Sequence, residues 1–115
     1  MRVDVQRREW QPFLEGFGER NNTRPTRLQV INESGEVETD YWLEDGLTLA
    51  GTTLDKDGGG APRIEIILNG GKSQDSRMTR TIAQVRRLGH EEDGERDIAL
   101  EVEGKDGNVT ILRFE

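Results

Sequence analysis

Apolar and polar residues alternate along most of the chain between Thr26 and Phe114, in short runs separated by turn residues. Alternation places every second side chain on the same face, which is the pattern of a half-buried β-strand. No run of helical periodicity separates successive strands, so the crossover connections of a parallel sheet are not expected. The sequence therefore predicts an antiparallel sheet in which consecutive strands are neighbours.

About six to seven short strands are expected in this part of the chain. Their apolar positions are Leu28 and Val30, Val37 to Leu43, Leu47 and Leu49, Ile64 to Leu68, residues 78–88, Ile98 to Val102, and Val109 to Phe114. The fifth run changes phase near Ala83 to Val85, which we interpret as a β-bulge within one strand. Asp106-Gly107 between the last two runs predicts a hairpin.

An amphipathic helix is expected before the strands. Its apolar residues stand at i, i+3, i+4 and i+7, namely Trp10, Phe13, Leu14 and Phe17. These spacings put all four on one helical face. Pro12 fits a helix only in its first turn, which predicts a start near Arg8 or Glu9.

The length of 115 residues is typical of a single domain, here residues 1–115. We therefore expect an α+β fold, in which the N-terminal helix packs on a mostly antiparallel, curled β-sheet. A small barrel or roll is the arrangement that we favour. Only 31% of the residues are hydrophobic and 34% are charged, so the core must be small and the surface heavily charged.

The formal net charge of −7 disfavours general binding to nucleic acids or to anionic membranes. The chain has no cysteine, so neither a disulfide framework nor thiolate chemistry is available to it. The start of the chain lacks the apolar core of a signal peptide, and no run is long enough for a membrane span. A cytoplasmic location is the expectation.

The stretch from Asp55 to Arg63, DKDGGGAPR, contains elements of two ligand-binding loops. A helix–loop–helix calcium loop needs a glutamate at its twelfth position, but Ile66 stands there when the count begins at Asp55. A phosphate loop needs a helix after the glycines, whereas Pro62 and the alternating residues that follow predict a strand. We interpret this stretch as a hairpin connection.

His90 is the only histidine and lies in the polar run from Gly89 to Glu95. A zinc site usually needs several nitrogen or sulfur ligands, and no spacing suggests a nucleophile with its base. We therefore expect a solvent-exposed loop histidine. The carboxylates are spread through turns and outward strand positions, so no catalytic residue, no metal ligand and no cofactor site is assigned.

Arg77, Arg80, Arg86 and Arg87 concentrate positive charge on the fifth predicted strand. They are candidates for a strip that contacts an anion or RNA on a barrel face. The alternative is cross-strand pairing with acidic neighbours such as Glu101 and Glu103.

Trp42 shares its strand parity with Asp40 and Glu44, on the face expected to meet water. An exposed tryptophan is a frequent anchor of protein interfaces. A twist, a bulge or the docked helix would instead bury it. Trp42 is therefore a candidate partner-binding residue with both alternatives open.

The succession of motifs resembles a bacterial family of short proteins, domain of unknown function 5335. The matching segments are Trp10 to Phe17, Leu47 to Gly51, Thr79 to Leu88, and Leu100 to Phe114. The resemblance implies a small soluble bacterial domain without an assigned reaction or cofactor. Arg77 and Arg80 stand where histidines are expected in relatives, and Gln84 where proline is expected, so a role of such histidines does not carry over.

The leading functional hypothesis is a non-enzymatic protein-interaction module. Self-association through an exposed strand edge or the surface around Trp42 is one form of it. The alternative is a small β-barrel that binds an anion or nucleic acid through the strand from Arg77 to Arg87. A carboxylate-based hydrolase is the third hypothesis. The sequence identifies no small-molecule ligand.

Overall fold

The computed structural model describes residues 2–41, 47–55, 62–70, 77–94 and 96–114. In chain order the elements are β1 (Arg2–Asp4), the 3-10 helix η1 (Arg7–Glu9), α1 (Trp10–Arg20), β2 (Thr26–Ile31), β3 (Val37–Tyr41), β4 (Thr48–Asp55), β5 (Arg63–Asn69), β6 (Arg77–Ile82), β7 (Val85–Asp93), β8 (Arg96–Gly104) and β9 (Val109–Phe114). The predicted α+β composition is confirmed. The described residues form nine strands rather than six to seven, because β1 was not expected and the fifth predicted strand is divided.

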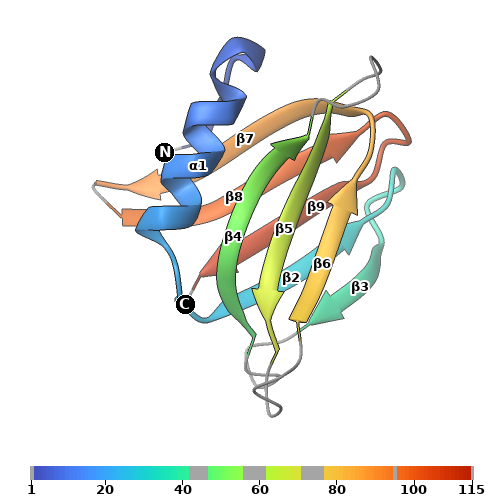
Figure 1. Ribbon diagram of the computed structural model, residues 1–115. Helices are drawn as coiled ribbons and strands as arrows, with labels where there is room; N and C mark the ends of the chain where they lie inside the picture. Colours follow the sequence, from blue (N-terminus) through green and yellow to red (C-terminus); the bar gives the residue numbers. More distant parts are fainter. Residues whose placement is uncertain (1, 42–46, 56–61, 71–76, 95, 115) are drawn as a thin grey trace.

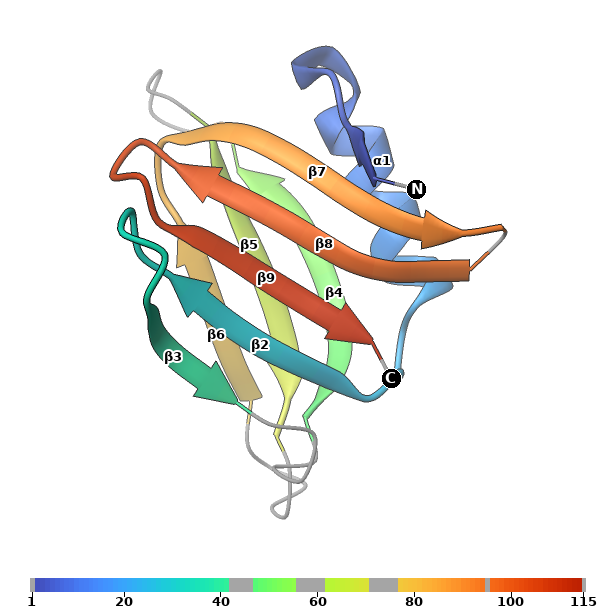
Figure 2. The same ribbon diagram turned by 180° about the vertical axis from the view of Figure 1, so that it is seen from behind.

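The strands pair into two antiparallel sheets. The larger sheet has the order β1-β7-β8-β9-β2-β3, and the smaller sheet has the order β4-β5-β6. In Figure 1 the smaller sheet lies in front of the larger one, and Figure 2 shows the same two layers from behind. The antiparallel pairing is confirmed, whereas the described strands form two layers and no closed barrel.

The hydrophobic core lies between the two sheets and under the helix. Its buried members are Trp10, Leu14, Phe17, Leu28, Leu47, Leu49, Ile64, Ile66, Leu68, Ile82, Val85, Leu88, Leu100, Val102 and Leu112. Contacts at the corners join the layers. They include a β-bridge between Pro25 and Thr48, and a hydrogen bond that the Val85 amide donates to the Pro62 carbonyl at 3.0 Å.

The predicted helix forms and docks through its apolar stripe. It begins at Trp10, after the turn of η1, and packs against β4, the edge strand of the smaller sheet (Figure 1). A Cβ on Gly18 would lie 3.0 Å from the backbone nitrogen of Thr52, so glycine permits this close approach. The Thr52 hydroxyl donates to the Leu14 carbonyl at 2.6 Å. Neither of the described helices has the length and apolarity to span a lipid bilayer.

The fifth predicted strand is two strands in different sheets. Residues 77–82 form β6 in the smaller sheet, and residues 85–93 belong to β7 in the larger one. Gln84 has a φ of 51°, a left-handed conformation that is uncommon for a residue other than glycine. The change of phase near Ala83 to Val85 therefore marks a corner between the sheets and not a bulge within one strand.

The connection after Asp55 links antiparallel neighbours, as the hairpin interpretation requires. β4 and β5 pair with Asp55 opposite Arg63, and the Arg63 Nη2 atom lies 2.6 Å from the Asp55 Oδ2 atom. Residues 56–61 lie outside the described part of the chain. Asp55 and Arg63 thus close the end of a strand pair.

Candidate anion-binding site

The four arginines of the predicted strip do not share one strand. Arg77 and Arg80 belong to β6, and Arg86 and Arg87 belong to β7 in the other sheet. Arg77 pairs with Asn69 at the end of β6 farthest from the Gln84 corner. A continuous strand from Arg77 to Arg87 is therefore wrong, and the corner decides which arginines approach one another.

Arg86 and Arg87 make the cross-strand pairs that were the alternative to ligand binding. The Arg86 Nε atom lies 2.6 Å from Glu103 Oε2, and the Arg87 Nη2 atom lies 3.5 Å from Glu101 Oε2. Arg87 also donates to Asp4 Oδ1 at 3.1 Å. Burial lowers the pKa of the Arg87 guanidinium, but the hydrogen bond and charge of Asp4 and the charges of Glu103 and Glu101 outweigh it and raise that pKa. The guanidinium of Arg87 thus stays charged, and neighbouring carboxylates balance its charge.

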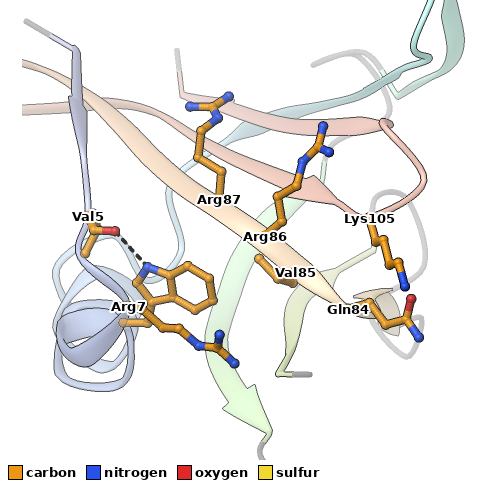
Figure 3. Close-up of a pocket in the computed structure, with 8 residues that line it drawn as sticks. Val5, Arg7, Gln84, Val85, Arg86, Arg87 and Lys105 are labelled. Atoms are coloured by element: carbon orange, nitrogen blue, oxygen red, sulfur yellow. Dashed lines mark hydrogen bonds between the residues drawn. The ribbon is translucent and has the colours of Figure 1, made fainter. Parts of the chain in front are cut away.

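A pocket of about 400 Å³ opens beside the N-terminal end of the helix. Its lining residues are Val5, Arg7, Trp10, Gln84, Val85, Arg86, Arg87 and Lys105, and Figure 3 shows them. Trp10 is only 3% exposed, and its indole nitrogen donates to the Val5 carbonyl at 2.8 Å. The Arg7 guanidinium carbon lies 6.0 Å from the centre of the Trp10 ring. A fixed aromatic ring therefore forms part of the wall, with cationic groups around it.

Two cations of this pocket have no carboxylate partner among the described residues. Arg7 contacts the face of Trp10, and Lys105 is held through its backbone amide, which donates to the Gln84 carbonyl at 3.0 Å. Arg86, although paired with Glu103, keeps 58% of its side chain exposed. Positive charge is therefore available here although the whole chain carries −7.

A second pocket of about 290 Å³ adjoins the first across Gln84 and Lys105, which line both. Arg80 lines the second pocket, and its Nε atom is buried without a hydrogen-bond partner among the described residues. We call Arg7, Arg80, Gln84, Arg86 and Lys105 the basic corner. An unpaired buried donor costs about 1–3 kcal/mol unless a ligand or water accepts from it, so an anion would improve this arrangement.

Sequence reasoning found part of the basic corner. Arg80 and Arg86 were candidates, whereas Arg7 and Lys105 were missed, because they stand in a short 3-10 helix and a turn that have no period to interpret. Trp42, the remaining candidate, lies outside the described residues. Its role stays a prediction.

The expectation of a loop histidine is wrong. His90 lies within β7, its side chain is 12% exposed, and its ring centre is 4.9 Å from that of Phe13. β7 continues to Asp93, because its polar residues pair with β8 up to the turn. His90 pairs with Leu100 on the core-facing side of the sheet, which explains its burial.

Searches against family models, curated proteins and solved structures returned no match to this chain. The resemblance to the bacterial family therefore stays a prediction.

Proposed function

We propose that this chain is a non-enzymatic interaction module whose basic corner binds a carboxylate-bearing segment of a partner protein. The observation that carries the proposal is the pair of cations, Arg7 and Lys105, that line a pocket and lack carboxylate partners among the described residues. Charged groups on a protein surface gain from pairing with opposite charge, most of all where a concave site excludes water.

An acidic peptide suits this site better than a nucleic acid does. The two pockets have volumes of about 400 and 290 Å³, which suit a few side chains. A nucleic acid needs a basic stripe that follows its backbone, and the remaining surface of this chain is acidic. A short segment can place its carboxylates in the basic corner while the rest of it stays clear of that surface.

Replacing both Arg7 and Lys105 by glutamine should weaken binding of a fluorescein-labelled oligoglutamate peptide about tenfold, a loss of about 1.4 kcal/mol. Two charge-assisted contacts are removed while Trp10 and the β6–β7 corner remain in place. Fluorescence anisotropy, recorded at low and at physiological salt, measures the Kd. Binding should weaken with salt because the contacts are near the surface.

The matched control is the pair Arg8→Gln and Arg113→Gln, which changes the net charge equally but lies outside both pockets. It should alter the Kd by about twofold or less, since both side chains are exposed to solvent, where salt screens their charges, and neither lines a pocket. Equal loss in both double variants would refute a specific site. Tighter binding of single-stranded RNA than of the peptide would favour the nucleic-acid alternative.

Self-association through Trp42 is a separate proposal. Trp42 directly follows β3, which is the last strand of the larger sheet and pairs only with β2 among the described strands. An edge strand beside an aromatic residue is a natural place for a second chain to add.

If Trp42 anchors such an interface, sedimentation equilibrium should show a mass that rises above 13.0 kDa with concentration. The Trp42→Ala variant should stay at the monomer mass. Fluorescence quenching of Trp10→Phe, in which Trp42 is the only tryptophan, should fall as the protein associates. A wild-type protein that remains monomeric throughout the range would rule this interface out.

A further inference from the structure

The core-facing side of β7 and β8 brings three metal-binding side chains together. One ligand atom from each of His90, Glu92 and Asp97 lies within 4.8 Å of the other two. An imidazole nitrogen and two carboxylate oxygens form a ligand set that first-row divalent cations accept. The cluster lies apart from the basic corner, whose pockets it does not line.

The register of the two strands explains why these residues meet. His90 and Glu92 are two positions apart on β7 and therefore share a face. Glu91 of β7 pairs with Ala99 of β8, but the next residue, Glu92, pairs with Asp97. Ile98 of β8 is therefore skipped in the pairing. This irregularity at Ile98 turns Asp97 to the side of His90, and Asp97 is buried as a result.

Two neighbouring side chains donate to Asp97 and fix the orientation of its carboxylate. The Asn21 Nδ2 atom donates to Asp97 Oδ2 at 2.8 Å, and the Arg20 Nε atom donates to the same oxygen at 3.1 Å. Both bonds use Oδ2 and leave Oδ1 for another ligand. Partners of this kind orient ligating carboxylates and support metal affinity.

The imidazole of His90 is only partly satisfied by its protein neighbours. His90 Nε2 lies 3.4 Å from Glu92 Oε2, while Nδ1 is buried and has no hydrogen-bond partner among the described residues. A buried, unsatisfied ring nitrogen is unfavourable in a folded protein. Nε2, the nitrogen beside Glu92, is the ring atom placed to coordinate a cation, and the unsatisfied Nδ1 shows that the ring is not fully satisfied by its protein neighbours.

We propose that His90, Glu92 and Asp97 bind one first-row divalent cation, for which Zn²⁺ is the natural probe. Metal–ligand distances of about 2.0–2.2 Å at tetrahedral angles put two ligand atoms of one ion about 3.3–3.6 Å apart. Ligand atoms that now lie up to 4.8 Å apart therefore need to approach by roughly 1 Å. Arg20 and Arg24 line an adjoining pocket of about 580 Å³, which gives solvent access beside Asp97. Their positive charge opposes the cation, which predicts moderate affinity.

The test uses tag-free protein, because His90 is then the only histidine and gives one Cε1–H signal in a proton NMR spectrum. Zn²⁺ should shift this signal and saturate at one equivalent. In thermal unfolding, free Zn²⁺ at about a hundred times the Kd should raise the Tm by about 10 °C. Mg²⁺ should change neither reading, because it prefers all-oxygen ligands and retains its waters.

The variants are His90→Phe, which keeps an aromatic ring against Phe13, and Glu92→Gln. The metal-induced change in Tm is measured within each variant, so a general loss of stability does not affect the comparison. Both should weaken Zn²⁺ binding at least about tenfold. Glu91→Gln is the matched control, because Glu91 precedes Glu92 and points to the other face of the sheet.

Retained binding in Glu91→Gln, together with loss in the other two variants, would support the site. Wild-type protein that shows no shift of its histidine signal with excess Zn²⁺ would overturn the proposal. Equal Zn²⁺ affinity in wild type and His90→Phe would also overturn it.

Discussion

Replacing Phe17 by alanine is expected to lower the free energy of unfolding by about 3–5 kcal/mol. Phe17 is fully buried, and its ring centre lies 5.7 Å from that of Phe13 and 5.6 Å from that of Phe114. It therefore joins the helix to the last strand of the chain. Truncation removes both ring contacts and leaves a cavity that the close-packed neighbours fill only in part.

Urea unfolding followed by circular dichroism measures this free energy. In thermal unfolding the Tm should fall by roughly 10–20 °C. Glu19→Ala is the matched control on the same helix, because Glu19 is exposed and should change stability by about 0.5 kcal/mol or less. A loss below about 1 kcal/mol for Phe17→Ala would contradict docking of the helix through this stripe.

The helix and most of the strands follow from periodicity alone. Trp10, Leu14 and Phe17 are buried on one face because a helix returns to the same side at those spacings. Leu28 and Val30 are buried on one face of a strand for the corresponding reason. The hairpin at Asp106-Gly107 was also predictable, since Gly107 adopts a φ of 86° that favours glycine.

The candidate sites were less predictable because they depend on local irregularities. At Gln84 the chain passes from one sheet to the other, and this corner brings Arg80 near Lys105 around a shared pocket. Alternation on β8 would place Ile98 inside and Asp97 outside, yet the skipped residue buries Asp97. The change of phase near Ala83 to Val85 locates the first irregularity but does not show that the chain changes sheets there, and the alternation along β8 gives no sign of the second. Tertiary pairing decides where each side chain points.

Asp97→Asn is expected to lower the stability of metal-free protein at neutral pH by about 2 kcal/mol. The Asp97 side chain is 7% exposed and accepts from Asn21 and Arg20 through one oxygen, so an amide oxygen in its place can accept both bonds but no longer carries the charge that strengthens them. Most of the effect comes from the buried bond to Asn21. Arg20 is 52% exposed, so solvent screens its contribution.

The same contacts predict how this difference depends on pH. Burial raises the pKa of the Asp97 carboxyl, but the hydrogen bonds from Asn21 and Arg20 and the charges of Arg20 and His90 outweigh it and lower the pKa below 3.8. Because the folded pKa is the lower one, the stabilisation is present above the unfolded value. It is lost as the pH falls through the folded value.

Wild type and Asp97→Asn should therefore differ most above about pH 4 and converge below it. Urea unfolding in the presence of EDTA, repeated across this range, measures the difference without a contribution from bound metal. Asp93→Asn is the control, because Asp93 lines the same pocket but is exposed. Its stability should follow that of wild type. A gap between wild type and Asp97→Asn that stays constant with pH would mean that the amide acts through packing, and that the ionised carboxylate does not stabilise the end of the helix.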